Sequence, residues 1–527
     1  MMKKHYIAMA LLLGATTVAQ AQDTYLNDRL TATDDLFGSS RYVGMGGAMG
    51  ALGADLSVIS SNPAGIGLYR KSEIGLTFGA VVPGKTNGWN SSDYRTYGEK
   101  LPRAAFDQMG FVFSMRMSGK VKYVNLAVNY QKKANYNLGF YADNANLGGL
   151  SQMDQLGELA NVGYDTDYNL AGLAYDNGFF EEWNEQIYNG FRGQRNQYTR
   201  HQRGSLQGYD FNLSFNVNDR FYTGLTFGLD NVNYLSWSSY SEISKNAEGI
   251  RGDHTLYNDR QIDGTGLNVK LGFIARPMAE RPFRVGLTVE TPTWYRMKNS
   301  TLYDLSYDVE PDNYITHPKE SYIETTLRTP WRARLSMGST VDNFLAWGIE
   351  YEYANPAKTK MGYPTWDWND SYHSPYSNSA DRAMNQQTKH TLRGQHTLRL
   401  GLEAKPIDAV AVRVGYNFIS NRYKANPTFD QFSIDSKACD YLTSTDYMSL
   451  SAANIVTFGL GFKYKKFYAD LAYKYRMQNA KFYAFDTSFT QDKDFMASYP
   501  DLEGAMIQPV DLNLERHQVQ LSLGFKF

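Results

Sequence analysis

Charged side chains at every second position are the feature of this sequence that could most directly perform chemistry. Arg328, Arg332 and Arg334 share one parity in a stretch of alternating apolar and polar residues, and Glu350 and Glu352 do so in the next stretch. Alternate residues of a β-strand point to one face, so these groups are expected to share a polar surface. Such arginines and carboxylates can pair across neighbouring strands. The same surface could bind the carboxylate of a ligand, and the sequence leaves both roles open.

Six more charged residues fall on polar faces by the alternation of their own stretches: Arg399, Glu403, Arg413, Asp470, Lys474 and Arg476. No pattern typical of an active site accompanies them. The chain has no Gly-x-Ser-x-Gly turn, and nothing singles out a serine, a histidine and an acid as a catalytic set. The single cysteine, Cys439, cannot form an internal disulfide. We therefore expect no enzymatic activity, no cofactor and no metal site.

The elements that position these charges are predicted to be β-strands, because apolar and polar residues alternate over fourteen stretches. The stretches are 73–82, 108–117, 121–140, 209–217, 221–234, 265–276, 283–294, 327–341, 344–354, 396–405, 409–420, 454–463, 467–477 and 516–527. Short turns such as 118–120 and 342–343 alternate with long connections such as 141–208 and 355–395. This asymmetry is typical of bacterial outer-membrane barrels, and soluble β-sandwiches and propellers lack it. The predicted fold class is therefore all-β, a closed transmembrane antiparallel β-barrel of about 14 strands.

The start of the chain, residues 1–21, has the features of a signal peptide: two lysines, a short apolar run and an Ala-Gln-Ala cleavage site. Elsewhere no stretch approaches the length of apolar sequence that a membrane-spanning helix needs. The formal net charge of −1 leaves no excess of basic residues for binding nucleic acid. These features predict export to the outer membrane of a Gram-negative bacterium, in contact with its lipid.

A segment rich in small residues lies between the signal peptide and the first strand. Residues 41–55 are mostly glycine, alanine and methionine, and Asn62-Pro63-Ala64 follows them. Glycine permits a close approach of surrounding backbone, and Asn-Pro marks a turn. This segment, its Asn-Pro-Ala motif and the strand pattern after it resemble the FadL/TodX family of outer-membrane transport proteins. Residues 520–527 are similar to the terminal strand that the barrel assembly machinery reads in such proteins.

The resemblance implies a hatch of residues 22–71 inside the lumen of a barrel formed by residues 72–527. It also implies that the protein is a monomer and takes up hydrophobic small molecules passively, such as long-chain fatty acids or aromatic compounds. In the family, the route leaves the lumen through a lateral opening near a kinked third strand. Here the predicted third strand has no glycine between Val121 and Leu138, so the sequence does not place such an opening.

Two long connections carry apolar residues that could capture a ligand. The connection 141–208 contains Leu150, Met153, Leu156 and Leu159 at helical spacing, followed by Phe179, Trp183, Ile187 and Phe191 at intervals of four. Two short amphipathic helices are expected there. The connection 355–395 contains Trp366 and Trp368, whose rings could stack on a ligand. These groups either pack on the barrel rim or form an apolar capture groove.

Two functions from different classes are consistent with this pattern. The leading interpretation is a channel for passive uptake of hydrophobic molecules. The alternative is a binding, adhesion or haem-receptor-like protein whose barrel displays extracellular loops, a reading that an immobile plug would favour. Histidines for haem occur in the connections, at His201, His254, His317, His373 and His390, but form no close pair of ligands.

Overall fold

The computed structural model describes residues 21–527 except 84–103, 162–168, 177, 184–185, 310–311, 316–317, 343, 367–374, 425–438, 488–489 and 491–499. The predicted signal peptide therefore lies outside the described residues apart from Ala21, which begins a helix. None of the helices in the described part of the chain is long and apolar enough to cross a membrane.

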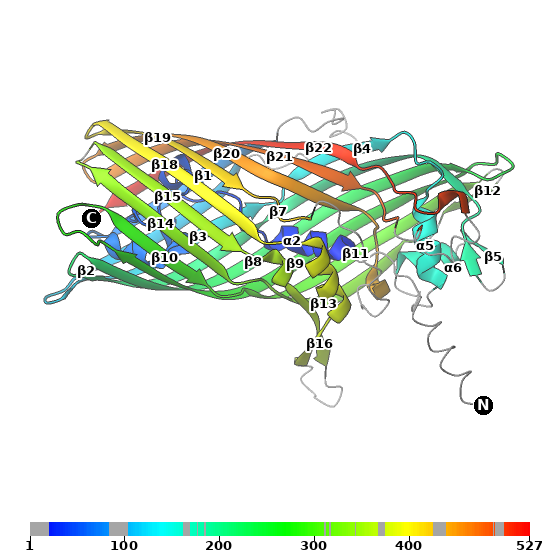
Figure 1. The fold of residues 1–527 in the computed structure, drawn as a ribbon, viewed down its shortest axis with the longest axis horizontal. Coiled ribbons are helices and arrows are strands. Elements are labelled where there is room, and N and C mark those ends of the chain that lie inside the picture. The colour runs from blue at the N-terminus through cyan, green and yellow to red at the C-terminus, as the bar shows by residue number, and fades with distance from the viewer. Residues whose placement is uncertain are drawn as a thin grey trace.

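A closed antiparallel β-barrel of fourteen strands forms the body of the molecule, as the alternation predicted (Figure 1). Closure occurs between the first and last strands, where Ile74 pairs with Phe525 and Pro83 with Arg516. Ser72 and Phe527 exchange backbone hydrogen bonds of 3.0 and 3.1 Å just beyond this ladder. A closed ladder leaves no edge of unpaired backbone groups for lipid to cover.

The barrel strands, in chain order, are β1 (Glu73–Pro83), β2 (Ala104–Arg116), β3 (Val121–Asn135) with β4 (Leu138–Asn144), β7 (Arg192–Val217), β8 (Phe221–Lys245), β9 (Gly252–Ala275), β10 (Arg284–Glu290) with β11 (Trp294–Val309), β13 (Lys319–Arg328) with β14 (Arg332–Val341), β15 (Leu345–Ala354), β18 (Gln395–Ile407), β19 (Val410–Ile419), β20 (Tyr447–Tyr464), β21 (Phe467–Tyr483) and β22 (Val510–Lys526). Each of the fourteen predicted stretches corresponds to one of these strands or strand pairs, although end residues such as Met117 and Phe283 fall just outside. Strands β7, β8 and β9 continue far beyond their predicted ends, because the alternation of apolar and polar residues fades there while the hydrogen-bonded ladder persists.

The alternation sorts side chains between the outside and the lumen. On β8, Phe221, Phe227 and Leu229 are exposed on the outer face, whereas Thr226 and Asp230 are buried. The other strands repeat this pattern, so an apolar belt surrounds the barrel and polar groups fill it. This arrangement suits a wall between lipid and a polar interior.

Tight turns connect successive strands at one end of the barrel, which we call the turn end. Asn218 and Asp219 join β7 to β8 with φ of +55° and +56°, the conformation of a two-residue hairpin turn that matches strand twist. Asp342 and Lys465 also have positive φ in the turns after β14 and β20. The predicted turns at these positions are confirmed.

Three predicted continuous strands are interrupted in the structure. The stretch 283–294 divides into β10 and β11 around Pro292, and the stretch 327–341 divides into β13 and β14 around Pro330. Proline has no N–H to donate to a ladder, which explains both interruptions. The stretch 121–140 divides into β3 and β4 at Tyr136 and Asn137, where no proline is present and Gly204 of β7 lies opposite.

The remaining elements form three groups. In the lumen lie α2 (Ala21–Thr31), α3 (Ser40–Gly44), α4 (Val58–Ser61) and the 3-10 helix η1 (Pro63–Leu68). Opposite the turn end, the cap end carries α5 (Gln152–Asn161), α6 (Leu170–Asp176), β5 (Glu181–Trp183), β6 (Gln186–Tyr188), β12 (Asp312–Ile315) and η7 (Pro500–Leu502). Nearer the middle of the barrel's length lie η4 (Pro356–Lys358), β16 (Lys360–Trp366), β17 (Pro375–Ala380), α7 (Arg382–Thr391) and η5 (Cys439–Tyr441), with α7 in contact with α2 (Figure 1). Helices α5 and α6 pack with Phe140, Tyr198 and Phe482 in one apolar cluster, which we call the cap.

Candidate functional site: a filled lumen beside a broken strand

The Asn-Pro-Ala motif lies inside the barrel, where Asn62 begins η1. Its Oδ1 accepts a hydrogen bond from the backbone N–H of Ala64 at 3.1 Å, so it caps the 3-10 helix. Its Nδ2 donates to the carbonyl of Gly50 at 2.9 Å and to that of Phe273 in the wall at 3.4 Å. One buried amide thus joins two parts of the luminal segment to strand β9.

Glycines of the wall make room for this motif. A methyl group added at Gly272 would lie 2.8 Å from the backbone nitrogen of Ala64, and one at Gly286 would lie 2.8 Å from Asn62 Nδ2. A methyl group at Gly224 would lie 2.5 Å from the carbonyl carbon of Pro63. These distances are shorter than van der Waals contact, so only glycine allows the luminal backbone to approach so closely.

Glycines also occupy the next strands of the wall at positions that the luminal backbone approaches closely. Gly338, Gly348, Gly401 and Gly415 are direct ladder partners across β14, β15, β18 and β19. The carbonyls of Ala48 and Met45 face Gly348 and Gly401, and the amide of Gly46 faces Gly415. We call the seven wall positions the glycine belt: Gly224, Gly272, Gly286, Gly338, Gly348, Gly401 and Gly415. The belt is not among the features predicted from the sequence, although glycine recurs on the polar face of successive strands there.

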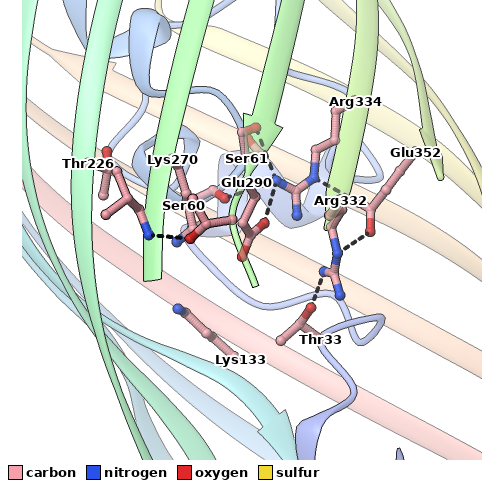
Figure 2. Close-up of polar contacts among 12 residues, drawn as sticks. Thr33, Ser60, Ser61, Lys133, Thr226, Lys270, Glu290, Arg332, Arg334 and Glu352 are labelled. Carbon is pink, nitrogen blue, oxygen red and sulfur yellow. Dashed lines mark hydrogen bonds and ion pairs between the residues drawn. The ribbon is translucent and has the colours of Figure 1, made fainter. Parts of the chain in front are cut away.

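Arg334 lies beside the Asn-Pro-Ala motif and contacts several charged and polar groups of the lumen (Figure 2). It forms ion pairs of 3.0 Å with Glu290 and 2.9 Å with Glu352, and it reaches the backbone carbonyl of Ser61 at 3.4 Å. Arg332 pairs with Glu352 at 3.3 Å and contacts Thr33 of the luminal segment. These arginines therefore neutralise wall carboxylates and hold the luminal segment at the same time.

Glu350 and Glu352 face the lumen as predicted, and both pair with Arg399 at 2.8 Å. The side chain of Arg328 does not face the lumen, so the prediction that it points inward is wrong. It is exposed, and its guanidinium lies 6.0 Å from the centre of the Trp294 ring on the outer face. The interruption at Pro330 changes the parity between β13 and β14, so that Arg328 and Arg332 point to opposite sides.

Two further networks tie the luminal segment to the wall. Asp35 accepts hydrogen bonds from Lys474 and Arg516, each at 3.0 Å. Arg41 pairs with Glu403 at 3.1 Å, and Glu403 pairs with Arg413 at 2.6 Å. The charges predicted on these strands are thus used to hold the segment that fills the lumen.

The third strand of the wall is broken beside this filling. β2 and β3 pair only as far as Gln108 and Gln131, and beyond that point β3 and β4 pair with β7 among the described residues. Tyr136, at the break, donates its backbone N–H to the carbonyl of Gly204 at 3.0 Å. Gly204 has a φ of +122°, a conformation that few other residues adopt. The glycine that permits the break therefore lies on the neighbouring strand β7, and not on the third strand itself.

A cavity of about 90 Å³ lies behind the break, and we call it the break cavity. Its wall side includes Ala134, Tyr136 and Leu138, and its luminal side includes Arg29 and Asp34. Tyr136 Oη donates a hydrogen bond of 2.5 Å to the carbonyl of Leu30 in α2. The break and the luminal segment are therefore in direct contact.

Of the predicted capture residues of the connection 141–208, Phe179 belongs to the cap, and Phe191 contacts Tyr307 at the edge of the cap. A helix through 179–191 is wrong: Gly178 (φ +73°) follows α6, and β5 and β6 form a hairpin. Phe179 is buried with its ring centre 4.3 Å from that of Tyr307, and Phe191 approaches the same ring at 6.1 Å. Ile187 is half-buried. The helix expected at 150–159 corresponds to α5.

For the other predicted aromatic residues, Trp183, Trp366 and Trp368, the structure describes at most the backbone. Trp183 lies in β5 and Trp366 ends β16, but their side chains lie outside the described part of the structure, as does all of Trp368. A separate cavity of about 1080 Å³, the side hollow, crosses β7, β8, β9, β11 and β13. Trp237, Leu302 and Tyr322 line it together with polar residues. Its size is that of a pocket for a small ligand.

Comparison with solved structures gives the fold. A FadL homologue from Pseudomonas aeruginosa shares 13% sequence identity, with 94% of this chain and 99% of that chain aligned at a TM-score of 0.50. The chain has the fold of that FadL homologue. The toluene transporter TodX of P. putida aligns over 94% of this chain and 99% of its own, with 10% identity and a TM-score of 0.48. No family profile and no curated protein matches the sequence.

Buried acids hold the cap to the barrel at the first turn of α5. Ser151 Oγ accepts from the N–H of Met153 at 3.1 Å, and Asp154 accepts from the N–H of Ser151 at 2.9 Å, a reciprocal capping box. Glu242 of β8 accepts from Ser151 Oγ at 2.5 Å. Burial raises the pKa of Asp154 to about 8 and that of Glu242 to about 7, and it lowers the pKa of neighbouring His254 to about 3. Among the described residues, no group of acids, histidines or cysteines could hold a metal ion.

Replacement of Gly272 by valine is expected to displace the Asn-Pro-Ala motif. Overpacking of this kind costs roughly 1–3 kcal/mol, enough to move a small luminal segment while the barrel persists. Planar-bilayer recordings should show a larger conductance than that of the wild type, and the barrel should still migrate as a heat-resistant band. Thr265→Val, on the outer face of the same strand, is the control and should leave conductance unchanged. A wild-type conductance in Gly272→Val would contradict the role assigned to the belt.

The cap is expected to loosen as pH rises. The folded cap holds the protons of Asp154 and Glu242 to higher pH than the unfolded chain does, so the free energy of unfolding falls between about pH 4 and pH 8. His254 has the opposite effect, but only below about pH 6.5. Hydrogen exchange of α5, corrected for the intrinsic rate, should therefore be faster at about pH 8.5 than at about pH 6.5. Asp154→Asn should reduce this difference, and equal protection of wild-type α5 at both pH values would disprove the assignment.

Proposed function

We propose that this protein is an outer-membrane channel that takes up small apolar molecules by diffusion. The observation that carries the proposal is the broken third strand with the break cavity behind it. A filled polar lumen gives an apolar molecule no axial route, whereas a break in the wall offers a sideways route into the lipid. The printed descriptions of similar structures, a FadL homologue and a toluene transporter, are in keeping with this function.

The luminal segment, residues 22–71, acts in this proposal as a hatch. Seating in the glycine belt and ion pairs to the wall would prevent leakage of ions through a barrel of this width. The sequence shows no ATP-binding, redox or energy-coupling motif, and passive movement of the ligand down its concentration gradient is the proposed mechanism. The ligands are long-chain fatty acid-like or aromatic molecules, and the protein needs no cofactor.

The proposed orientation places the turn end in the periplasm and the cap outside the cell. This follows the asymmetry of bacterial outer-membrane barrels, whose short turns are periplasmic. The apolar belt then contacts outer-membrane lipid, and the barrel assembly machinery inserts the chain as a monomer. The protein would lie in the outer membrane of a Gram-negative bacterium.

Capture is proposed at two places at the cap end. The side hollow offers Trp237 and Tyr322 to an apolar ligand. Phe179, Ile187 and Phe191 would supply further apolar surface when the cap loosens, and Trp183, Trp366 and Trp368 are proposed as further capture residues. In the structure Phe179 already packs on Tyr307, so its surface becomes available only after the cap moves.

The break itself is tested by Gly204→Ala. An added methyl group would disfavour the φ of +122° and press on the backbone of Asn233, so the break should change its conformation. Uptake of labelled oleate or toluene by proteoliposomes should fall several-fold while the barrel stays heat-resistant. Gly119→Ala is a matched control, because Gly119 has a φ of +101° in a turn with open space around it.

Unchanged uptake by Gly204→Ala, with wild-type rates in the control, would exclude the sideways route. Absence of uptake by the wild-type protein for both ligands would favour the alternative, a binding or adhesion protein in which the hatch is a permanent seal.

The side hollow is tested by Trp237→Ala and Tyr322→Ala. Each aromatic side chain buried against a ligand contributes roughly 1.5–3 kcal/mol, so each variant should bind toluene about tenfold or more weakly. Phe227→Ala, in the apolar belt on the same strand as Trp237, is the control and should bind normally. Equilibrium binding to the purified protein gives the measurement, and wild-type affinity in both variants would remove the hollow from the route.

A further inference from the structure

The side hollow lies on the outer face of the barrel wall. Lining side chains that point outward are accessible, as at Tyr322 (54% exposed) and Leu302 (43% exposed). The residues between them on the same strands point to the lumen and are buried, as at Gln202 and Ser321. A cavity of about 1080 Å³ exposes the side chains that face it, so the outward set bounds this hollow.

The outward side chains of the hollow form two neighbouring rows that cross five strands. Ladder pairing places the residues of each row side by side from β7 to β13. The row nearer the cap consists of His201, Trp237, Asp259, Leu302 and Glu320. The second row consists of Arg203, Leu235, Gln261, Ser300 and Tyr322. Polar and apolar side chains are thus mixed in both rows.

Two carboxylates of this surface have no role in the capture of an apolar molecule. Neither Asp259 nor Glu320 has a hydrogen bond or ion pair with another residue in the part of the chain that the structure describes. An apolar ligand seated over them would remove them from water without replacing the hydrogen bonds, which is unfavourable. A ligand that suits the whole hollow therefore carries hydrogen-bond donors.

The charges of the hollow do not favour a strongly charged ligand. Arg203 offsets part of the charge of Asp259 and Glu320, and Arg260 is buried on the luminal side of its strand. The outward groups include acceptors at the two carboxylates, donors at Arg203 and a hydroxyl at Ser300. Hydroxyl groups of a ligand can satisfy all of these, because each hydroxyl both donates and accepts.

The two aromatic rings of the hollow stand apart from each other. Trp237 is on β8 and Tyr322 on β13, and β9 and β11 lie between those strands. Three strand spacings amount to roughly 14 Å. A ligand that contacts both rings is therefore elongated and crosses the polar groups between them. A saccharide chain has this form, with apolar C–H faces on its rings for aromatic side chains and hydroxyls at their edges.

The hollow also lies beyond the apolar belt. On the outer face of β8 the belt reaches Leu229, and Asn231 and Asn233 follow before the hollow begins at Leu235. Six residues of a strand span about 20 Å along its length. In the proposed orientation this level is outside the hydrocarbon layer and outside the cell, where the glycolipids of a Gram-negative outer leaflet carry their sugars.

We infer that the side hollow is a saccharide-binding site, in which Trp237 and Tyr322 stack on sugar rings and Asp259 and Glu320 accept hydrogen bonds from sugar hydroxyls. This inference goes beyond the proposed function, since it assigns to the hollow a second class of ligand, which is polar. The two classes share the aromatic rings, so a saccharide and toluene compete. The saccharide is either a free oligosaccharide or the sugar chain of a glycolipid, and the test separates these sources.

The test measures binding to the purified full-length barrel by isothermal titration calorimetry. Maltotriose represents a free oligosaccharide, and the lipid-free polysaccharide of smooth lipopolysaccharide represents a glycolipid. The wild type should bind at least one of them, in competition with toluene. Trp237→Ala should weaken this binding about tenfold or more through loss of a stacked ring. Asp259→Asn should weaken it about threefold or more through loss of a charged acceptor, and should leave the affinity for toluene unchanged.

Matched controls lie outside the hollow. Trp294→Ala removes an exposed tryptophan from the outer face of β11, and Asp408→Asn neutralises an exposed acid in a turn at the turn end. Both should bind the saccharide as the wild type does. A loss in Trp294→Ala as large as that in Trp237→Ala would overturn the site.

The remaining outcomes separate this inference from the proposed function. Binding of the polysaccharide alone supports the site with a glycolipid as its source, and binding of maltotriose alone supports it with a free oligosaccharide. A wild type that binds neither, or binding that survives both Trp237→Ala and Asp259→Asn, overturns the site and leaves the channel intact. Absence of toluene binding and uptake in the wild type overturns the channel and leaves the site intact. If Trp237→Ala does not form a heat-resistant barrel, Asp259→Asn decides: weaker saccharide binding supports the site, and unchanged binding overturns it.

Discussion

Direct contact between the luminal backbone and the inner face of the wall is the constraint on which the rest of the structure depends. A fourteen-strand barrel is too wide for its own side chains to fill, so a separate segment must occupy it. Here that segment approaches so closely that wall residues such as Gly272 and Gly401 can have no side chain. The wall sequence is thus adapted to the segment as much as the segment is to the wall. The polar residues that remain on the inner face can then meet the segment through hydrogen bonds and ion pairs.

The ion pairs contribute specificity more than stability. Arg334, Glu290 and Glu352 are all removed from water, and the cost of removing them offsets much of their mutual attraction. Loss of one member would leave a buried charge without a partner, which costs about 3–5 kcal/mol. Such a network disfavours any register of the luminal segment in which a single pair is broken. It fixes one position for Asn62 and its neighbours, which apolar packing alone would specify less sharply.

Much of the fold follows from the alternation of side chains, because a wall between lipid and a polar lumen requires a period of two at every strand. Turn residues such as Asn218 and Asp342 were predictable for the same local reason. The interruptions were harder to predict. Pro292 and Pro330 lie in stretches whose apolar pattern continues through them, and the parity of Arg328 was lost at one of these breaks. The spacing of Phe179 and Phe191 fits a helix, yet their shared contact with Tyr307 depends on a strand distant in the sequence.

The candidate site shows why a single strand cannot be interpreted alone. The break in the third strand needs a residue with positive φ, and that residue is Gly204 on the adjacent strand. Tyr136 then reaches inward to the carbonyl of Leu30, so one hydrogen bond joins the wall at the break to α2. A movement of α2 must either break that bond or carry Tyr136 with it. Because Tyr136 lies at the break itself, displacement of α2 and a change in the shape of the wall at the break are mechanically linked through this bond.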